Sequence, residues 1–266
     1  MVSKKYKKVS EETNVTKRGG NVFKNDDGTP VTQRINQADV DPTLQWAEKI
    51  VGLDLVNHKL GSTGIRSDSG DMDIAVDKDK VNKDQLIAKL KAWKDKNAPN
   101  DSDREWFAKS GINVHFKTPI KGDPKNGFVQ LDLMFGEPEF MKFAMKGSGD
   151  DTPYKGKHRA ILISSIAKFH GYKFNSQTGL VDRITNKTVS KNPDEIAQYL
   201  LGDNAKGGDL DSVETIVAKI KGDPNYDAMI ADAVEWFEKD GLKMPESIQY
   251  EGRDWFRHTL DKLNEI

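Results

Sequence analysis

The chain has 266 residues, of which 31% are charged and 36% hydrophobic, and its formal net charge at pH 7 is −1. These values are typical of a globular protein with one large domain or two small ones, and the net charge indicates no partner. The absence of cysteine excludes a disulfide framework and a cysteine zinc site. No apolar run approaches the roughly 18 residues of a membrane span, and none follows the basic start as in a secretory signal. We therefore expect a cytoplasmic protein with no membrane partner.

The charges are unevenly distributed along the chain. Residues 140–191 contain ten lysines or arginines and three acids, whereas residues 192–266 contain eight basic and seventeen acidic residues. A segment with one sign of charge is typical of a surface that faces a partner of the opposite sign. Residues 140–191 are therefore the candidate surface for a polyanion, and the acidic tail is not.

The first elements are predicted from turn and capping residues. The first forty residues are polar, with Gly-Gly and Asp-Gly turn signals, and predict an N-terminal arm or loose hairpin over 1–40. A helix is expected next, because Asp41 can cap it, Pro42 suits its first position and Gly52 can end it. A strand then leads into Gly61-Ser62.

Strands are predicted where apolar and polar residues alternate, which occurs at residues 71–76, 112–117 and 128–135. Asp71 and Asp73 share the polar face of the first strand, and Asp132 lies on the corresponding face of the third. A helix with Leu86, Leu90 and Trp93 on one side is expected to pack behind this sheet.

After Gly136 the pattern becomes mainly helical. A hairpin-like stretch over 174–189 interrupts a series of helices, which are expected at residues 162–169, 193–201, 213–220, 224–237 and 255–263. The fold class is therefore predicted to be α+β: a mixed β-sheet with flanking helices over 41–140, followed by a mainly helical part over 141–266.

The main chemical signal is the set of three aspartates. Asp71 and Asp73 project from one strand face about 7 Å apart, and Asp132 can meet them if its strand is a neighbour. Three converging carboxylates repel one another unless divalent cations neutralise them, and Mg²⁺ prefers oxygen ligands. Two such ions can clamp an in-line phosphoryl displacement. We therefore predict that all three aspartates are catalytic and ligate two Mg²⁺ ions, with Mn²⁺ as an alternative, and that Asp132 also helps to deprotonate the attacking hydroxyl.

The loop before Asp71 offers groups that suit a triphosphate. Gly61 and Gly70 allow the backbone to approach phosphates closely. Ser62 and Ser69 offer hydroxyl and amide donors, and Arg66 offers a fork for phosphate oxygens. These five residues are the predicted nucleotide-binding set.

The alternative interpretation is that the aspartates are ordinary surface residues. An Asp-x-Asp pair alone is more often part of a solvated strand face than of a metal site. Here the pair follows a Gly-Ser turn, and a third aspartate interrupts an otherwise apolar strand, which favours chemistry. The five histidines lack metal-ligand spacing and are expected to be structural or on the surface. Four tryptophans are expected in the core, namely Trp46, Trp93, Trp236 and Trp255.

Together these residues resemble the signature of the DNA polymerase beta nucleotidyltransferase superfamily. The motifs that carry the resemblance are Gly61-Ser62, Ser69-Gly-Asp-Met-Asp73 and Leu131-Asp-Leu133. The string from Ser69 to Asp73 is similar to that of the family X DNA polymerases. The resemblance extends over about residues 41–202 and implies a nucleotidyltransferase palm over 41–140 and a thumb-like, helical C-terminal domain over 141–266.

The resemblance implies a reaction and its partners. A nucleoside monophosphate would move from an NTP or dNTP to an acceptor hydroxyl, with release of pyrophosphate. Lys155, Lys157 and Arg159 precede a predicted helix and match the thumb region, so the expected acceptor is a nucleic-acid 3′ end on DNA, RNA or tRNA. Transfer to a protein or small molecule, or nucleotide or nucleic-acid binding without catalysis, are the alternatives.

Two departures from the family limit what the resemblance implies. The spacing from Ser62 to Asp71 is one residue tighter than in polymerase beta, so Arg66 matches the family's phosphate-binding arginine only approximately. The first forty residues are too short for the helical lyase domain of that family, which argues against gap-filling repair.

Overall fold

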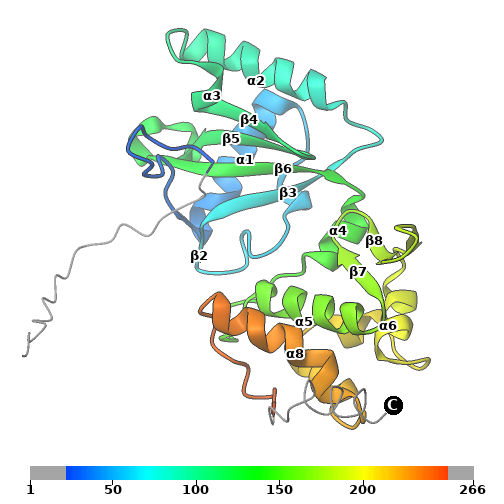
Figure 1. The fold of residues 1–266 in the computed structure, drawn as a ribbon. Helices are drawn as coiled ribbons and strands as arrows, with labels where there is room; N and C mark the ends of the chain where they lie inside the picture. Colours follow the sequence, from blue (N-terminus) through cyan, green and yellow to red (C-terminus); the bar gives the residue numbers. More distant parts are fainter. Residues whose placement is uncertain (1–21, 251–266) are drawn as a thin grey trace, which may run out of the picture.

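Figure 1 shows the computed structural model of the chain, which describes residues 22–250. This part of the chain is an α+β structure, in which a mixed four-stranded sheet with flanking helices is followed by a mainly helical part. The fold class predicted from the sequence is therefore confirmed. The helix expected over 255–263 lies outside the described residues.

The central sheet has the strand order β3-β6-β5-β4. Its strands are β3 (Asp71–Asp77), β4 (Phe107–Ser110), β5 (Asn113–Pro119) and β6 (Phe128–Gly136). β3 pairs with β6 in parallel, whereas β5 pairs antiparallel with both β6 and β4. The connection from β3 to β6 passes through α2 (Lys83–Asn97), the short α3 (Asp103–Trp106), β4 and β5. The three predicted strands are present, and β4 is an additional edge strand.

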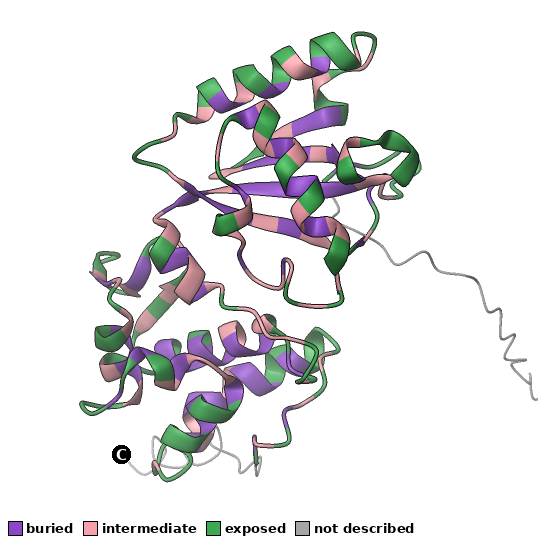
Figure 2. Ribbon diagram, turned by 180° about the vertical axis from the view of Figure 1, so that it is seen from behind, coloured by how far each residue is buried: buried purple, intermediate pink, exposed green. Residues whose placement is uncertain are grey.

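One face of the sheet is apolar and is covered by α1 (Gln37–Val51) and α2. Leu44 and Leu90 from these helices join one buried cluster with Met72, Phe116 and Leu131 of the strands. Burial of each such side chain contributes about 1.5–3 kcal/mol to folding. Figure 2, seen from behind, shows the buried sides of the helices facing the strands and the exposed sides facing outward. The opposite face of the sheet is left for polar residues.

Helix α1 begins earlier than predicted. Asn36 is its N-cap, so Asp41 and Pro42 lie inside the helix and not at its start. The buried stripe includes Val40, which extends the apolar pattern by one turn and explains the earlier start. Gly52 ends the helix as predicted, in the left-handed conformation with φ 69°.

The predicted strand before Gly61 does not form. The segment contains a 3₁₀ helix, η1 (Val56–His58), followed by single β-bridges from Lys59 to Ile74 and from Gly61 to Lys146. The chain therefore meets β3 at one point and then turns away toward the C-terminal part, because Gly61 adopts a positive φ of 59°.

The described part of the expected N-terminal arm is ordered against the sheet. Residues 24–30 form a loose hairpin around Gly28, as the Asp-Gly signal predicted. The next residues form β1 (Ile35–Asn36), which pairs with β2 (Asp68–Ser69) beside the loop that precedes β3. This pairing places Arg34 at the edge of that loop.

The helical part contains a second hydrophobic cluster. Its elements are α4 (Pro138–Ala144), α5 (Gly156–Phe169), α6 (Pro193–Leu201), α7 (Val213–Ile220) and α8 (Tyr226–Lys239), with 3₁₀ helix η4 (Gly207–Leu210). The hairpin-like stretch is a three-stranded sheet of β7 (Tyr172–Asn175), β8 (Gly179–Asp182) and β9 (Thr188–Ser190). α5 and α8 pack side by side in Figure 1 and share buried residues such as Ile166 and Phe237.

Candidate active site

The strand register brings the predicted aspartates together. β3 and β6 pair so that Asp73 lies opposite Asp132, and Asp71 lies opposite Gln130. β5 in turn places His115 opposite Asp132. Since neighbouring strands are about 4.8 Å apart, Asp73, Asp132 and His115 form a row across the polar face of three strands. The condition that the sequence left open, that the third aspartate lies on a neighbouring strand, is met.

Asp71 and Asp73 lack the side-chain hydrogen bonds that usually stabilise a buried carboxylate, within the part of the chain that the structure describes. Within residues 22–250, no hydrogen-bond donor of another residue reaches either carboxylate. Burial, followed by the charges of Asp71 and Asp132, raises the pKa of Asp73 from its ordinary value of 3.8 to about 8. Burial and the charge of Asp132 also raise the pKa of Asp71, against the opposing effect of Arg34. A cation at these carboxylates would restore their ionised form.

Asp132 is held differently. Its side chain is buried, with 8% of the residue exposed. Its Oδ1 atom lies 2.7 Å from His115 Nδ1, and Gln130 Nε2 donates to both of its oxygens, at 2.9 and 3.0 Å. The amide of Gln130 is itself oriented by the Val22 N–H, which donates to Oε1 at 2.9 Å. Asp132 therefore has the hydrogen bonds that its two neighbours lack.

The loop before β3 lies against the aspartates and against the helical part. A Cβ atom added to Gly61 would lie 3.4 Å from Asp73 Oδ2, so this backbone passes next to the carboxylate. A Cβ atom at Gly147 would lie 1.9 Å from the carbonyl oxygen of Gly61, and only glycine fits there. The close approach joins the loop to the segment after α4.

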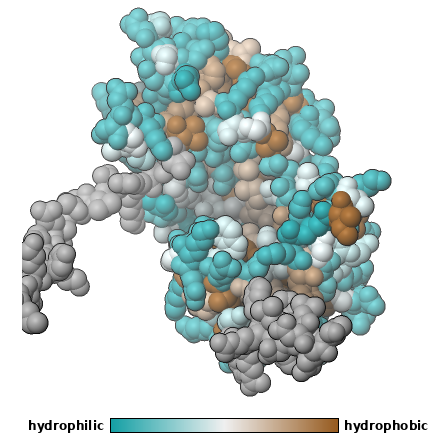
Figure 3. All heavy atoms as spheres, in the orientation of Figure 1, coloured by the Kyte–Doolittle hydropathy of each residue, from teal (hydrophilic) through white to brown (hydrophobic). Residues whose placement is uncertain are grey.

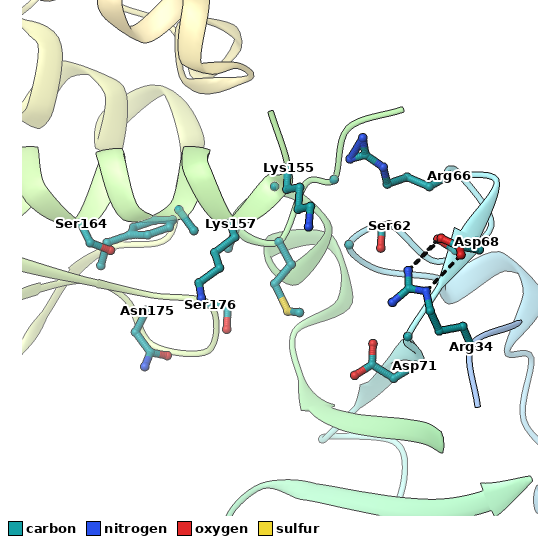
Figure 4. Close-up of a pocket in the computed structure, with 18 residues that line it drawn as sticks. Arg34, Ser62, Arg66, Asp68, Asp71, Lys155, Lys157, Ser164, Asn175 and Ser176 are labelled. Carbon is teal, nitrogen blue, oxygen red and sulfur yellow. Dashed lines mark hydrogen bonds and ion pairs between the residues drawn. The ribbon is translucent and has the colours of Figure 1, made fainter. Parts of the chain in front are cut away.

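A cleft of about 890 Å³ opens where the loop, β3 and the start of α5 meet. The space-filling view in Figure 3 is hollowed between the sheet and the helical part. The cleft is lined by predicted site residues from both parts, namely Gly61, Ser62, Arg66, Gly70, Asp71, Lys155 and Lys157. Figure 4 shows Asp71 and the cations around it.

Ser69 does not reach this cleft. The residue is buried in β2, and its hydroxyl donates to the Ser62 carbonyl at 3.2 Å. The Ser69 hydroxyl stabilises the loop from within, and the nucleotide-binding role of Ser69 stays a prediction that this arrangement does not support. Ser62 and Gly70, on either side of that contact, do line the cleft.

Arg66 lines the cleft and also ties the loop to the helical part. Its Nε atom lies 3.2 Å from Asp150 Oδ1, and its Nη2 atom donates to the Thr152 carbonyl at 3.1 Å. Asp150 also accepts from the Ser67 N–H at 2.6 Å. The remaining Nη1 atom is buried without a hydrogen-bond partner. A buried donor of this kind is costly unless a ligand satisfies it, and an anion in the cleft is such a ligand.

Arg34 is a cleft residue that the sequence did not reveal. Its Nη2 and Nε atoms lie 2.8 and 3.1 Å from the carboxylate of Asp68, and Figure 4 shows the pair beside Asp71. The nearby charges of Asp68 and Asp71 contribute to raising the pKa of Arg34, after the hydrogen bond to Asp68. Arg34 lies in the polar segment before α1, and that segment has no periodic pattern of apolar residues from which its position could be predicted.

Of the three predicted nucleic-acid contacts, two face the cleft and one is buried. Lys155 and Lys157 are exposed, and Lys157 Nζ also pairs with Asp240 at 2.6 Å. Arg159 is only 3% exposed and donates to the carbonyls of Leu210 and Ala144, at 2.5 and 3.1 Å. Its guanidinium joins α5 to neighbouring main chain, and nucleic-acid contact by Arg159 stays a prediction that this burial does not support.

Two further predictions concern aromatic residues and metal geometry. Trp46 and Trp93 pack against the sheet cluster as expected, whereas Trp236 is 47% exposed; Trp255 lies outside the described residues. Among residues 22–250, no three acidic or histidine side chains are close enough to form a ready-made metal site. Metal binding by Asp71, Asp73 and Asp132 thus stays a prediction. None of the helices in the described part is long and apolar enough to cross a bilayer.

Comparison with known proteins gives a distant structural similarity. No protein-family model matches the chain, and no curated protein sequence matches it. Two crystal structures of Leishmania infantum polymerase beta are similar to it, a ternary P/T complex at 13% identity and a ternary gap complex at 14%. Both give a TM-score of 0.35 and cover 83% of this chain, with 78% and 72% of the polymerase chains covered. The function proposed below depends on the side chains of this chain and not on this similarity.

Proposed function

We propose that this protein is a metal-dependent nucleotidyltransferase, which transfers a nucleoside monophosphate from an NTP or dNTP to the 3′ hydroxyl of a nucleic acid. The observation that carries the proposal is the row of aspartates beside the cleft. Two carboxylates without donors from other described residues, Asp71 and Asp73, lie beside a third that is already hydrogen-bonded. Asp71 lines the cleft, together with the cations Arg34, Arg66, Lys155 and Lys157.

The donor set of the site fits divalent cations. Asp71 and Asp73 present oxygen ligands, and burial together with repulsion among the three aspartates raises their pKa values, which a bound cation would lower. When bound, Mg²⁺ or Mn²⁺ lowers the pKa of the attacking hydroxyl and stabilises the charge on the leaving pyrophosphate. In this proposal Asp71, Asp73 and Asp132 would hold the ions through their carboxylate oxygens.

The chain's own groups orient the reactants. Arg34 and the unpartnered Nη1 of Arg66 bind phosphate oxygens, and the backbone at Gly61 and Gly70 allows close approach of the triphosphate. The acceptor oxygen forms a bond to the α-phosphorus while the bond to the β-phosphate oxygen breaks. Asp132 accepts the proton of the acceptor hydroxyl, and pyrophosphate leaves.

The proposal also gives each of the two parts of the chain a role. Residues 41–140 form the palm that carries the aspartates, and residues 141–266 form a thumb-like domain whose Lys155 and Lys157 contact acceptor phosphates. The segment before the palm contributes Arg34 and is therefore more than an arm.

A transfer assay tests the proposal. The protein is incubated with each α-labelled NTP and dNTP, with Mg²⁺ or Mn²⁺, and with DNA, RNA and tRNA as acceptors. We expect labelled nucleic acid and pyrophosphate from the wild type, and neither from the isosteric Asp73→Asn variant. Label on the protein itself or on a small molecule would instead support the alternative acceptors, and nucleotide binding without any transfer would support a binding protein.

A further inference from the structure

We propose that His115 is a positioning residue, which together with Gln130 fixes the orientation of Asp132 so that its Oδ2 atom faces the reaction. This inference rests on the proposed function. The starting point is the register, since β5 places His115 directly opposite Asp132 on the same sheet face. Both residues are buried, with 6% and 8% exposed. A buried imidazole requires a hydrogen-bond partner, and here the partner is a candidate catalytic carboxylate.

The hydrogen bonds define which atom donates. An ionised carboxylate only accepts, so His115 Nδ1 carries the proton that it donates to Oδ1. The Gln130 amide cannot turn over, because its Oε1 already accepts from the Val22 N–H. Its Nε2 therefore donates to Asp132. Gln130 is held by the Val22 main chain and His115 is buried on β5, and the carboxylate lies between the two donors.

The two oxygens of Asp132 are left unequal. Oδ1 accepts from both His115 and Gln130, whereas Oδ2 accepts only from Gln130, at 3.0 Å. Each carboxylate oxygen has two lone pairs, so Oδ2 retains the capacity to bind an ion or accept a proton. The arrangement assigns Oδ2 as the reactive atom and His115 as the group that occupies the other oxygen.

The proposed role explains why Asp132 is oriented by hydrogen bonds before any ion binds, whereas Asp71 and Asp73 are not. Asp71 and Asp73 gain their geometry when cations bind, but Asp132 has a fixed orientation before that. Reacting groups must be held within about 0.5 Å of the productive geometry. Replacing a residue that orients a metal ligand typically costs 10–100-fold in metal affinity or activity, and we expect that range for loss of the His115 donor.

Three variants test the inference. His115→Leu fills most of the volume without a donor, and His115→Asn restores an N–H near the position of Nδ1. Val114→Ala, on the opposite and fully buried face of β5, is the control for a general loss of packing. Mn²⁺ binding is measured by electron paramagnetic resonance on the full chain, and kcat and KM for nucleotide are measured in the transfer assay.

We expect His115→Leu to weaken one Mn²⁺ site or lower kcat by about 10–100-fold, with little change in KM for nucleotide. His115→Asn should recover much of the loss, and Val114→Ala should change neither quantity below its unfolding temperature. Wild-type Mn²⁺ affinity and kcat in His115→Leu would overturn the inference, as would equal losses in His115→Leu and His115→Asn.

The two proposals fail in different ways. If the wild type binds Mn²⁺ but transfers no nucleotide, the proposed function fails, and the Mn²⁺ affinities of the two His115 variants still decide the inference. If the wild type binds no Mn²⁺, the inference is overturned at once.

Discussion

The neighbouring strands β3 and β6 both carry aspartate on the polar face of the sheet, but the surroundings of these aspartates differ. Asp132 on β6 receives hydrogen bonds from His115 and Gln130. Asp71 and Asp73 on β3 receive none from another residue of the described chain, and their pKa values are raised. The row of like charges is therefore stabilised at one end by the protein and left at the other end for a cation.

This difference separates two tasks that one residue type performs. A carboxylate with fixed hydrogen bonds is positioned before the substrate arrives, whereas a carboxylate without them binds cations strongly because it gains most from neutralisation. The comparison predicts that substitutions on β3 and β6 will change the free energy of unfolding in opposite directions. It also predicts that both will lower kcat, and that only those on β3 will weaken binding of the metal–nucleotide complex.

The largest expected effect is on turnover. Asp132→Ala should lower kcat at least about 10²-fold and leave most nucleotide affinity intact, because the triphosphate is still held by the loop and the β3 pair. Asp71→Asn should lower kcat similarly and also weaken binding of the metal–nucleotide complex. Steady-state kinetics and nucleotide titration in the presence of Mg²⁺ measure both. Wild-type-like rates in Asp132→Ala would refute its catalytic role.

The next effect is on the free energy of unfolding, which substitutions at Asp73 and at Asp132 should change in opposite directions. In the metal-free protein, Asp73→Asn should raise the free energy of unfolding near neutral pH, because the folded state no longer has to protonate a carboxylate that is ionised in the unfolded chain. Asp132→Ala should lower it by about 1–3 kcal/mol, because it leaves the donors of His115 and Gln130 unsatisfied. Urea unfolding in EDTA measures both variants. A shift of the same sign in both would contradict the comparison.

The pH dependence of stability follows from the raised pKa of Asp73. Its pKa is about 8 in the folded protein and ordinarily 3.8, so between these values the folded state binds more protons than the unfolded chain. The metal-free protein should therefore lose stability as pH rises from about 4 to about 8. Unfolding curves across this range should show a smaller loss for Asp73→Asn. Added Mg²⁺ should restore stability at pH 8.

Much of this site follows from the sequence because its residues lie at fixed spacing. Alternation assigns Asp71 and Asp73 to one face of a strand, and the same pattern in residues 128–135 puts Asp132 on a polar face. The different environments of the aspartates could not be predicted, since they depend on the register of β5 with β6. The position of Arg34 likewise depends on the short β1–β2 pairing, which has no periodic pattern.

The burial of Arg159 and the exposure of Trp236, which differ from what was expected, both had a signal in the sequence. Arg159 lies three and seven residues before Leu162 and Ile166, which is the spacing of one helix face, so its burial in α5 follows from the same stripe. Trp236 is adjacent to Phe237, which belongs to the buried face of α8. Neighbours in a helix point about 100° apart, and a tryptophan beside the stripe is therefore exposed.

A smaller effect is expected at the two cleft arginines. Arg34→Ala should weaken triphosphate binding about 10-fold and leave nucleoside binding unchanged, because the lost contacts are charge-assisted hydrogen bonds to phosphate. Arg66→Ala should weaken it by a similar factor, since each arginine already uses Nε and Nη2 for protein partners and offers Nη1 to the phosphate. Calorimetric titration with ATP and adenosine separates the two ligands. Equal losses for both ligands would show that these arginines contact something other than phosphate.

The smallest effect concerns the helical part, where the lysines complement the carboxylates across the cleft. Lys155→Ala with Lys157→Ala should reduce the slope of log affinity against log salt by about one to two units, because each lost phosphate contact releases fewer counterions. Fluorescence anisotropy with labelled DNA and RNA measures the slope. Lys219→Ala, whose lysine pairs with Asp209 away from the cleft, is the matched control and should leave it unchanged. Asp240→Asn should increase the slope, because it releases Lys157 from its ion pair. If the wild type binds neither nucleic acid at low salt, these lysines do not contact an acceptor strand, and transfer to a protein or small molecule becomes the better proposal.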